Sequence, residues 1–520
     1  MTTYYIDSVN GSNGNSGTSE GLALQSLDAI AGLKLKAGDS VLLAKGSTFT
    51  STLKILSSGE AGNPITVGAY GDGDAPLLTG PIGIYGSKAS HIVVKDIAVA
   101  NTTQTGIYAG NASNWVIDNV SLSNTGTDTG IGSIVFKNGS NITVSNSKFD
   151  HVSSDAIYIV GVDGVTLVNN NVTNARGHTA DGIQVNDSKN VTVSGNVIDM
   201  ATSEDSTKGG ILVHNSSAVV VDDNVITGGA FGVSVNGWNV AITDNNISGQ
   251  DKYAWSSAVL ISGAMNLSDY AITGNTIHDS NFGVSLTGLA ADDVTRTNIS
   301  ITDNSFTDMI KYALKIDKLS TGSFTGNEVV NSQLSFIRSD EQKAAFSVND
   351  NLSLSTEEAA HHAPVVAPPV IAPVQPVETT PVIIIPEHAS PGTPPVITAP
   401  VTPGAQIDRY SMSSGLQISG NIIENDFRAD GELMSLRSVA SARIGTNGVD
   451  VKGVYGMLHV SASGDFTYTL DDGGLALLAQ SGTQIEKFQY KAADDKVIDT
   501  SKLMIDLTDF LPSTDHLLLL

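Results

Sequence analysis

Two aspartates stand at the same position in consecutive copies of a short sequence pattern. Asp155 precedes AIYIVG, and Asp181 precedes GIQVND. If these copies stack as parallel strands, neighbouring positions lie about 4.8 Å apart, which would bring the two carboxyl groups together. Such a pair can share a proton, act as acid and base on a glycosidic bond, or hold Ca²⁺. Alternatively, both residues accept backbone hydrogen bonds at the turn into a strand, which is a common role of Asp.

Basic, aromatic and polar residues gather in the same copies. The candidate proton carriers and cations are Lys137, Tyr158, His178 and Lys208, and the candidate substrate-binding residues are Arg176, Gln184, Asn186, Glu204, Asp205 and His214. Several of them stand in two long loops, TNARGHTAD and DMATSEDSTKG, and long loops over a solenoid build the walls of a cleft. Each residue also has a plainer interpretation, since Lys and His are often only solvated and Tyr158 could be a platform beneath a sugar ring. Their convergence makes residues 124–214 the candidate site.

Two reactions fit these residue types. In a β-elimination, Arg176, Lys208 or Ca²⁺ bound by Asp155 and Asp181 would neutralise a uronate carboxylate. His178 or Lys137 would then remove the C5 proton, and Tyr158 would protonate the leaving oxygen. In a hydrolysis, the two aspartates would form the carboxylate pair, one protonated and one ionised. The mixture of acids with bases favours elimination.

Internal repetition predicts the scaffold that carries these residues. Between about residues 90 and 338, first strands such as NITVSNS, GVTLVNN and NVTVSGN alternate with second strands such as AIYIVG, GIQVND and GILVHN. One copy is too short to bury its own apolar face, so successive copies must stack into a solenoid. Strands this short, with residues alternating in and out, predict a parallel β-helix and an all-β fold.

An asparagine recurs at the turn after the first strand. We expect these residues to adopt left-handed backbone geometry and their amides to form a hydrogen-bonded ladder between turns. The positions are Asn146, Asn170, Asn196, Asn224, Asn245, Asn275 and Asn304.

The N-terminal region adds a family resemblance. The segments YYIDSVNGSNGNSGTSEGLALQSLDAI, LKAGDSVLLAKGSTF and GNPITVGAYGDGDAPLLTG resemble the start of bacterial right-handed β-helix polysaccharide lyases and related glycanases. With the repeats, the resemblance covers about residues 3–340. It implies the right-handed β-helix fold and favours a lyase acting on an acidic exopolysaccharide. Hydrolases, epimerases and non-catalytic spikes share this scaffold, so it leaves the reaction open.

A proline-rich stretch separates two domains. Residues 361–403 read HHAPVVAPPVIAPVQPVETTPVIIIPEHASPGTPPVITAPVTP, which predicts an extended, semi-rigid spacer. We expect a β-helix catalytic domain over residues 1–350, a linker over 351–405 and a small antiparallel β-sandwich over 406–520. The last part, with GNIIENDFRADGELMSLRSV and GVYGMLHVSASGDFTYTLDD, resembles the cadherin-like VCBS-type modules. That resemblance implies a weak Ca²⁺ site at Asp426 and Asp430. The site lacks a ligand that such modules often have, because Arg428 or Ala429 stands where a third acid is common.

Composition limits the partners. The chain carries 27 Lys and Arg against 53 Asp and Glu, a formal net charge of -26, which repels nucleic acid and anionic membranes. It has no cysteine, which excludes disulfides and thiolate chemistry. We expect a monomer that acts on a polysaccharide, with Ca²⁺ as the candidate cofactor and no organic one.

Acidity and the absence of cysteine are typical of proteins exported by type I systems, and we therefore expect a secreted or cell-surface protein. The ending DLTDFLPSTDHLLLL resembles the uncleaved C-terminal signals of such proteins, and it equally fits a last strand followed by an apolar tail. Three functions follow in order of preference: a polysaccharide lyase, a glycoside hydrolase with paired Asp, and a non-catalytic glycan-binding adhesin or biofilm matrix protein.

Overall fold

The chain divides into two compact units, Met1–Ala363 and Pro364–Leu520. The computed structural model describes residues 1–126, 132–201, 203, 207–287, 294–355, 408–412, 416–423, 435–440, 442–445, 448–453, 455–471, 474, 485–493 and 498–507. Most of the predicted linker therefore lies outside the described residues. In the described part, no helix is long and apolar enough to cross a membrane.

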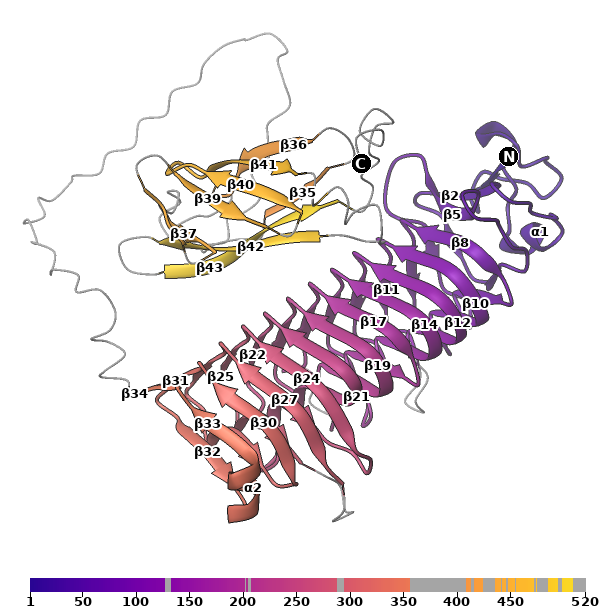
Figure 1. Ribbon diagram of the computed structural model, residues 1–520. Coiled ribbons are helices and arrows are strands. Elements are labelled where there is room, and N and C mark those ends of the chain that lie inside the picture. The colour runs from indigo at the N-terminus through magenta and orange to yellow at the C-terminus, as the bar shows by residue number, and fades with distance from the viewer. Residues whose placement is uncertain are drawn as a thin grey trace, which may run out of the picture. The chain divides into compact units, whose positions relative to one another are not determined.

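The first unit is the predicted parallel β-helix, in which successive strands lie side by side along one axis (Figure 1). Among the described residues, one sheet has 21 strands: β1 (Thr3–Ile6), β2 (Ser40–Ala44), β4 (Leu53–Lys54), β5 (Ile65–Tyr70), β7 (Ile84–Ser87), β8 (Ser90–Lys95), β10 (Ile107–Asp118), β12 (Ile134–Ser145), β14 (Ile157–Val168), β16 (Ile183–Asn186), β17 (Lys189–Ser194), β19 (Ile211–Asp222), β21 (Phe231–Thr243), β23 (Ser257–Ile261), β24 (Leu267–Thr273), β26 (Phe282–Leu286), β27 (Arg296–Thr302), β29 (Tyr312–Ile316), β30 (Ser320–Thr325), β32 (Gln333–Ile337) and β33 (Phe346–Asn349).

A second sheet of this unit has 13 described strands, all short: β3 (Thr48–Phe49), β6 (Leu77–Leu78), β9 (Ala98–Ala100), β11 (Ser121–Ser123), β13 (Lys148–Asp150), β15 (Asn171–Thr173), β18 (Val197–Asp199), β20 (Val225–Thr227), β22 (Asn246–Ser248), β25 (Thr276–His278), β28 (Ser305–Thr307), β31 (Glu328–Val330) and β34 (Leu352–Leu354). Short helices lie near the two ends of the unit: η1 (Glu20–Leu22) and α1 (Leu27–Ala31) near the start, and α2 (Asp340–Ala345) near the end.

The alternation of apolar and polar residues sets which side chains fill the solenoid. In β14, Ile157 and Ile159 point inward and are fully buried, whereas Tyr158 and Val160 are partly exposed. The same inward positions in every turn join one continuous core that runs from Ile6 to Phe346. Trp115 belongs to this core, and its Nε1 donates to the carbonyl oxygen of Ala89.

The asparagine ladder is present, but its predicted backbone geometry is wrong. The amide of Asn224 donates to Oδ1 of Asn245 at 2.9 Å, and the same contact repeats from Asn170 to Asn351 along the stack. The left-handed residue is the one before each ladder position, for example Asp223 at a φ of 59°. Asn146 is itself left-handed, and Ser147 takes the ladder position in that turn.

The second unit consists of two small sheets around their own core, which includes the buried rings of Tyr468 and Tyr490. One sheet contains β35 (Asp408–Ser411), β43 (Ile498–Asp506), β42 (Ile485–Ala493), β37 (Ser435–Val439) and β38 (Ala442–Arg443). The other contains β36 (Gln417–Asn421), β41 (Asp465–Leu470), β40 (Gly456–Val460) and β39 (Val449–Lys452). Pairing is antiparallel as predicted, except that β35 and β43 run parallel.

Candidate functional site

The strand register aligns the predicted columns of outward residues. Tyr158 pairs with Gln184, and Gln184 with Leu212 of the next turn. In the adjacent column, Asn186 pairs with His214. Residues about two dozen positions apart in the sequence are therefore neighbours on one face of the β-helix.

Asp155 and Asp181 occupy consecutive turns, but they do not stand on the open surface. They are 4% and 0% exposed. Oδ1 of Asp155 accepts the backbone N–H of Asp181 at 2.9 Å, and Oδ1 of Asp181 accepts that of Gly209 at 3.2 Å. Oδ2 of Asp181 is buried without a hydrogen-bond partner. In the structure, both residues therefore accept backbone hydrogen bonds at the turn into a strand, the alternative role given for them above.

Burial governs the ionisation of this pair. Loss of solvation raises the pKa of Asp155 to about 7, although the Asp181 N–H and the charge of Lys208 oppose the shift. Loss of solvation, followed by repulsion from Asp155, also raises the pKa of Asp181 well above its ordinary value. Both carboxyls therefore favour the protonated form over much of the acidic pH range.

The pair is a poor calcium site. Ca²⁺ takes six to eight oxygen ligands and prefers ionised carboxylates, whereas one oxygen of each carboxyl already accepts a backbone N–H. Among the described residues, no group of three or more acidic or His side chains could hold a metal ion. Asp426 and Asp430 lie outside the described residues, as do Glu204 and Asp205.

Other predicted site residues lie away from the main cavity. Nζ of Lys137 stands 5.8 Å from the centre of the Tyr158 ring, a cation–π contact on the outer face. Arg176 is exposed, and its backbone forms a bridge with Ser153. Together with Gln184 and Asn186, these residues do not line the cavity described next.

A cavity of about 850 Å³ opens over later turns of the same face. It brings together three of the predicted residues, His178, Lys208 and His214. Its other lining residues are Thr207, Leu212, Phe231, Ser234, Asn236, Tyr253, Trp255, Leu260, Ser262, Gly263, Ala264, Met265, Ser285, Thr287 and Lys315. The floor is formed by strands β19, β21, β23, β26 and β29, and the loops at either end of these strands form the walls.

One wall of the cavity is aromatic. The rings of Tyr253 and Trp255 stack with their centres 5.5 Å apart and their planes 7° from parallel. Trp255 is 45% exposed, while Tyr253 packs on a buried cluster that includes Phe231 and Leu260. An exposed aromatic face beside an apolar floor is a surface on which the C–H groups of a sugar ring can pack.

Two lysines and two histidines line the cavity. Lys208 stands on one side, and the histidines His178 and His214 are both exposed. Lys315 lies 4.9 Å from the Phe282 ring and pairs with Asp317 at 2.6 Å. No Asp or Glu appears among the described residues that line this cavity.

The loop QDKYAWSS, which contributes Tyr253 and Trp255, lies outside the predicted site of residues 124–214. The signal was present, because two aromatic residues stand in a polar loop directly before β23. The predicted columns also continue into the cavity, since Leu212 pairs with Ser234 and Ser234 with Leu260.

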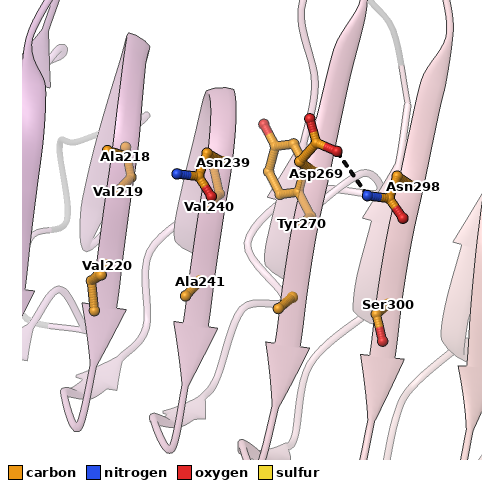
Figure 2. Close-up of a pocket in the computed structure, with 11 residues that line it drawn as sticks. Ala218, Val219, Val220, Asn239, Val240, Ala241, Asp269, Tyr270, Asn298 and Ser300 are labelled. Carbon is orange, nitrogen blue, oxygen red and sulfur yellow. Dashed lines mark hydrogen bonds between the residues drawn. The ribbon is translucent and has the colours of Figure 1, made fainter.

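A second hollow, of about 420 Å³, lies on another part of the solenoid surface and is drawn in Figure 2. In it, Nδ2 of Asn298 donates to Oδ1 of Asp269 at 2.7 Å, and short apolar side chains such as Val220 and Ala241 line the strands. Asp269 and the buried Tyr270 are its titratable groups among the described residues, so it offers little for proton transfer.

Comparison with known families identifies the first unit. The model of the right-handed β-helix region matches residues 82–228 and 200–353, together just over half of the chain. The chain belongs to this right-handed β-helix family.

Two characterised proteins share shorter stretches with this β-helix protein. One is the calcium-binding lectin RapA2 of Rhizobium johnstonii, 38% identical over 100 residues, which are 18% of this chain and 41% of the lectin. The other is a lacto-N-biosidase of Bifidobacterium longum, 43% identical over 77 residues, 14% of this chain and 5% of that enzyme. The matches thus span less than half the length of either relative.

Among solved structures, the GH136 lacto-N-biosidase from Eubacterium ramulus is similar over 68% of each chain, with 15% identity and a TM-score of 0.48.

Proposed function

We propose that this protein is a secreted lyase that cleaves an acidic, uronate-containing bacterial exopolysaccharide by β-elimination in the 850 Å³ cavity. The observation that carries the proposal is the charge of the cavity. Lys208 and two histidines line it, together with Lys315 in its ion pair with Asp317, and its described lining residues include no Asp or Glu, in a chain of net charge -26. A local cationic site in an acidic protein selects an anionic substrate.

The elimination assigns a step to each group. Lys208 would bind the uronate carboxylate and stabilise the negative charge that develops on it. His214, on the rigid strand β19, would remove the C5 proton as its neutral imidazole. The electron pair left at C5 forms the C4–C5 double bond as the C4–O bond breaks, and His178 would protonate the leaving oxygen. Tyr253 and Trp255 would hold a neighbouring sugar ring.

Hydrolysis by Asp155 and Asp181 is less well supported. A glycosidase needs both carboxyl groups beside the scissile bond, and these two are buried and do not line the cavity. The names of the two relatives, a lectin and a biosidase, support a carbohydrate ligand and do not select a reaction. We further propose that the protein acts as a monomer, outside the cell, after type I export.

The test is a screen of alginate, polygalacturonate, hyaluronan and a neutral glucan, with chain length read by viscosity and the unsaturated product by ultraviolet absorbance. Elimination predicts shortening of an acidic polymer together with a rise in absorbance. Shortening without absorbance would establish hydrolysis instead, and binding without shortening would establish a lectin or adhesin.

Two variants locate the reaction. Lys208→Ala should lower kcat/KM by about a hundredfold or more, within the range typical of lost electrostatic stabilisation of a transition state. Lys137→Ala is the matched control, because Lys137 lies on the same face outside the cavity. Equal losses in both variants would argue against the cavity as the active site.

A further inference from the structure

Asn236 lines the cavity, and the oxygen of its amide is unsatisfied. It stands on β21, next to His214 in the strand register. The residue is 6% exposed, and its Oδ1 is buried without a hydrogen-bond partner. A buried polar atom of this kind is costly, and native proteins usually satisfy it. An unsatisfied amide oxygen at the wall of a cavity therefore points to a partner that arrives with the ligand.

The wall beside this amide is built to accommodate it. Gly263 lies so close that a Cβ on it would stand 2.3 Å from Nδ2 of Asn236. The φ of Gly263 is 152°, a conformation that residues with a side chain rarely adopt. The site thus depends on a glycine to leave room for the Asn236 side chain.

A buried guanidinium fixes this wall from behind. Arg296 is fully buried, and its Nη2 donates to the carbonyl oxygens of Gly263 at 2.8 Å and Thr287 at 2.7 Å. Its Nη1 donates to the carbonyl oxygen of Met265 at 2.8 Å. All three acceptor residues line the cavity, so one side chain holds the wall in a single arrangement before any ligand binds.

We propose that Asn236, which packs against Gly263 at the cavity wall, is a specificity subsite for a sugar hydroxyl group next to the reacting uronate. This inference rests on the proposed function of the cavity. A hydroxyl both donates and accepts hydrogen bonds, so it matches a side-chain amide, whose oxygen and nitrogen exchange places on a half-turn. Lys208 supplies the contact for the carboxylate, and Asn236 distinguishes sugars by the hydroxyl that they place against it.

The test compares Asn236→Leu with Asn186→Leu. Asn186 is a matched control, because it lies in the same column on the other side of His214 and its Oδ1 also lacks a partner, but it does not line the cavity. Binding of oligomannuronate, oligogalacturonate and hyaluronan fragments is measured by titration calorimetry on the full chain. Asn236→Leu should weaken binding about threefold to tenfold, the effect of one neutral hydrogen bond, and Asn186→Leu should leave it unchanged.

Two further readouts separate a ligand contact from a structural one. The loss in Asn236→Leu should be the same at low and high salt, whereas the loss in Lys208→Ala should shrink as salt screens the charge. The ligand-free Tm of Asn236→Leu should not fall, since the substitution removes an unsatisfied polar atom. If the leucine variants do not fold, Asn236→Ala and Asn186→Ala give the same comparison.

The outcomes are distinct. If Asn236→Leu binds the fragments as tightly as the unmutated protein, the subsite is overturned and the proposed function is not. The same holds if Asn186→Leu weakens binding as much as Asn236→Leu. If no fragment binds the unmutated protein, the proposed function fails and the subsite with it.

Discussion

The backbone N–H of Asp181 donates a 2.9 Å hydrogen bond to the carboxyl group of Asp155, which lies one turn earlier in the β-helix. Asp181 in turn accepts the N–H of Gly209, the residue after Lys208 of the cavity. The two carboxyls therefore link three successive turns under the edge of the proposed site. Because both carboxyls are buried, these hydrogen bonds depend on pH.

The stability of the β-helix should fall as the pH rises through the range in which Asp155 ionises. Because its folded pKa of about 7 exceeds its ordinary value of 3.8, the folded state holds a proton that the unfolded state releases. The stability that this bound proton contributes is fully present below the pKa of the unfolded state and is lost as the pH rises through the pKa of the folded state. On the alkaline side, Asp155→Asn with Asp181→Asn should be more stable than the unmutated protein by at least about 1.4 kcal/mol, the equivalent of one pKa unit.

Thermal unfolding followed by Trp fluorescence checks this prediction in the full chain, because all three Trp residues, at positions 115, 238 and 255, lie in the first unit. Asp163→Asn is the control, since Asp163 is exposed in the same turn as Asp155. An unchanged pH profile in the double variant would show that the pair does not control it.

Trp255 should contribute to the binding of polysaccharide. Its stacked, exposed ring lines the cavity, so Trp255→Ala should raise KM about threefold to tenfold, in line with roughly 1 kcal/mol for a packed aromatic face. Trp238→Ala is a matched control, because Trp238 is 38% exposed and lies outside the cavity. Comparable increases in KM for both variants would count against a specific platform.

The scaffold was predictable because repetition encodes it. Parallel strands in register convert a sequence period into spatial neighbours, which is why Tyr158, Gln184 and Leu212 form the expected column. Burial was less predictable. Asp155 and Asp181 precede their strands by two residues, outside the regular alternation, and the sequence does not show which way a side chain points there.

The position of the cavity was also hidden from the sequence. Its aromatic wall is Tyr253 and Trp255, and its far wall is held by Arg296 from a later turn. These contacts depend on how loops fold over the strands, and no periodic pattern describes loops. The charged residues of the repeats therefore indicated His178, Lys208 and His214 but not the turns beyond them.

The asparagine ladder should be a main source of stability. Asn196 donates from both its backbone N–H and its Nδ2 to Oδ1 of Asn224. Asn224→Ala would leave the buried backbone N–H of Asn196 without its acceptor and would remove the amide that donates to the carbonyl oxygens of Val193 and Asp222. We therefore expect a loss of at least about 2 kcal/mol in the free energy of unfolding. Denaturant unfolding followed by Trp fluorescence measures it.

Asn141→Gly is the control for the ladder. Asn141 makes an exposed amide contact to Asn114, and glycine tolerates its φ of 54°. We expect a change within about 1 kcal/mol. If Asn224→Ala were no more destabilising than this control, the buried ladder would not be a special source of stability.

Arg296 should act on the proposed reaction by positioning the cavity wall. Arg296→Ala leaves the carbonyl oxygens of Gly263, Met265 and Thr287 without their donor, so kcat/KM should fall about tenfold or more. The substitution also opens a space lined by those carbonyls, which matches a free guanidinium ion in shape and hydrogen bonding. Guanidinium chloride, far below denaturing concentrations, should therefore restore part of the activity, whereas KCl at equal ionic strength should not. Equal recovery with KCl, or full activity without any addition, would show that the wall does not need this side chain.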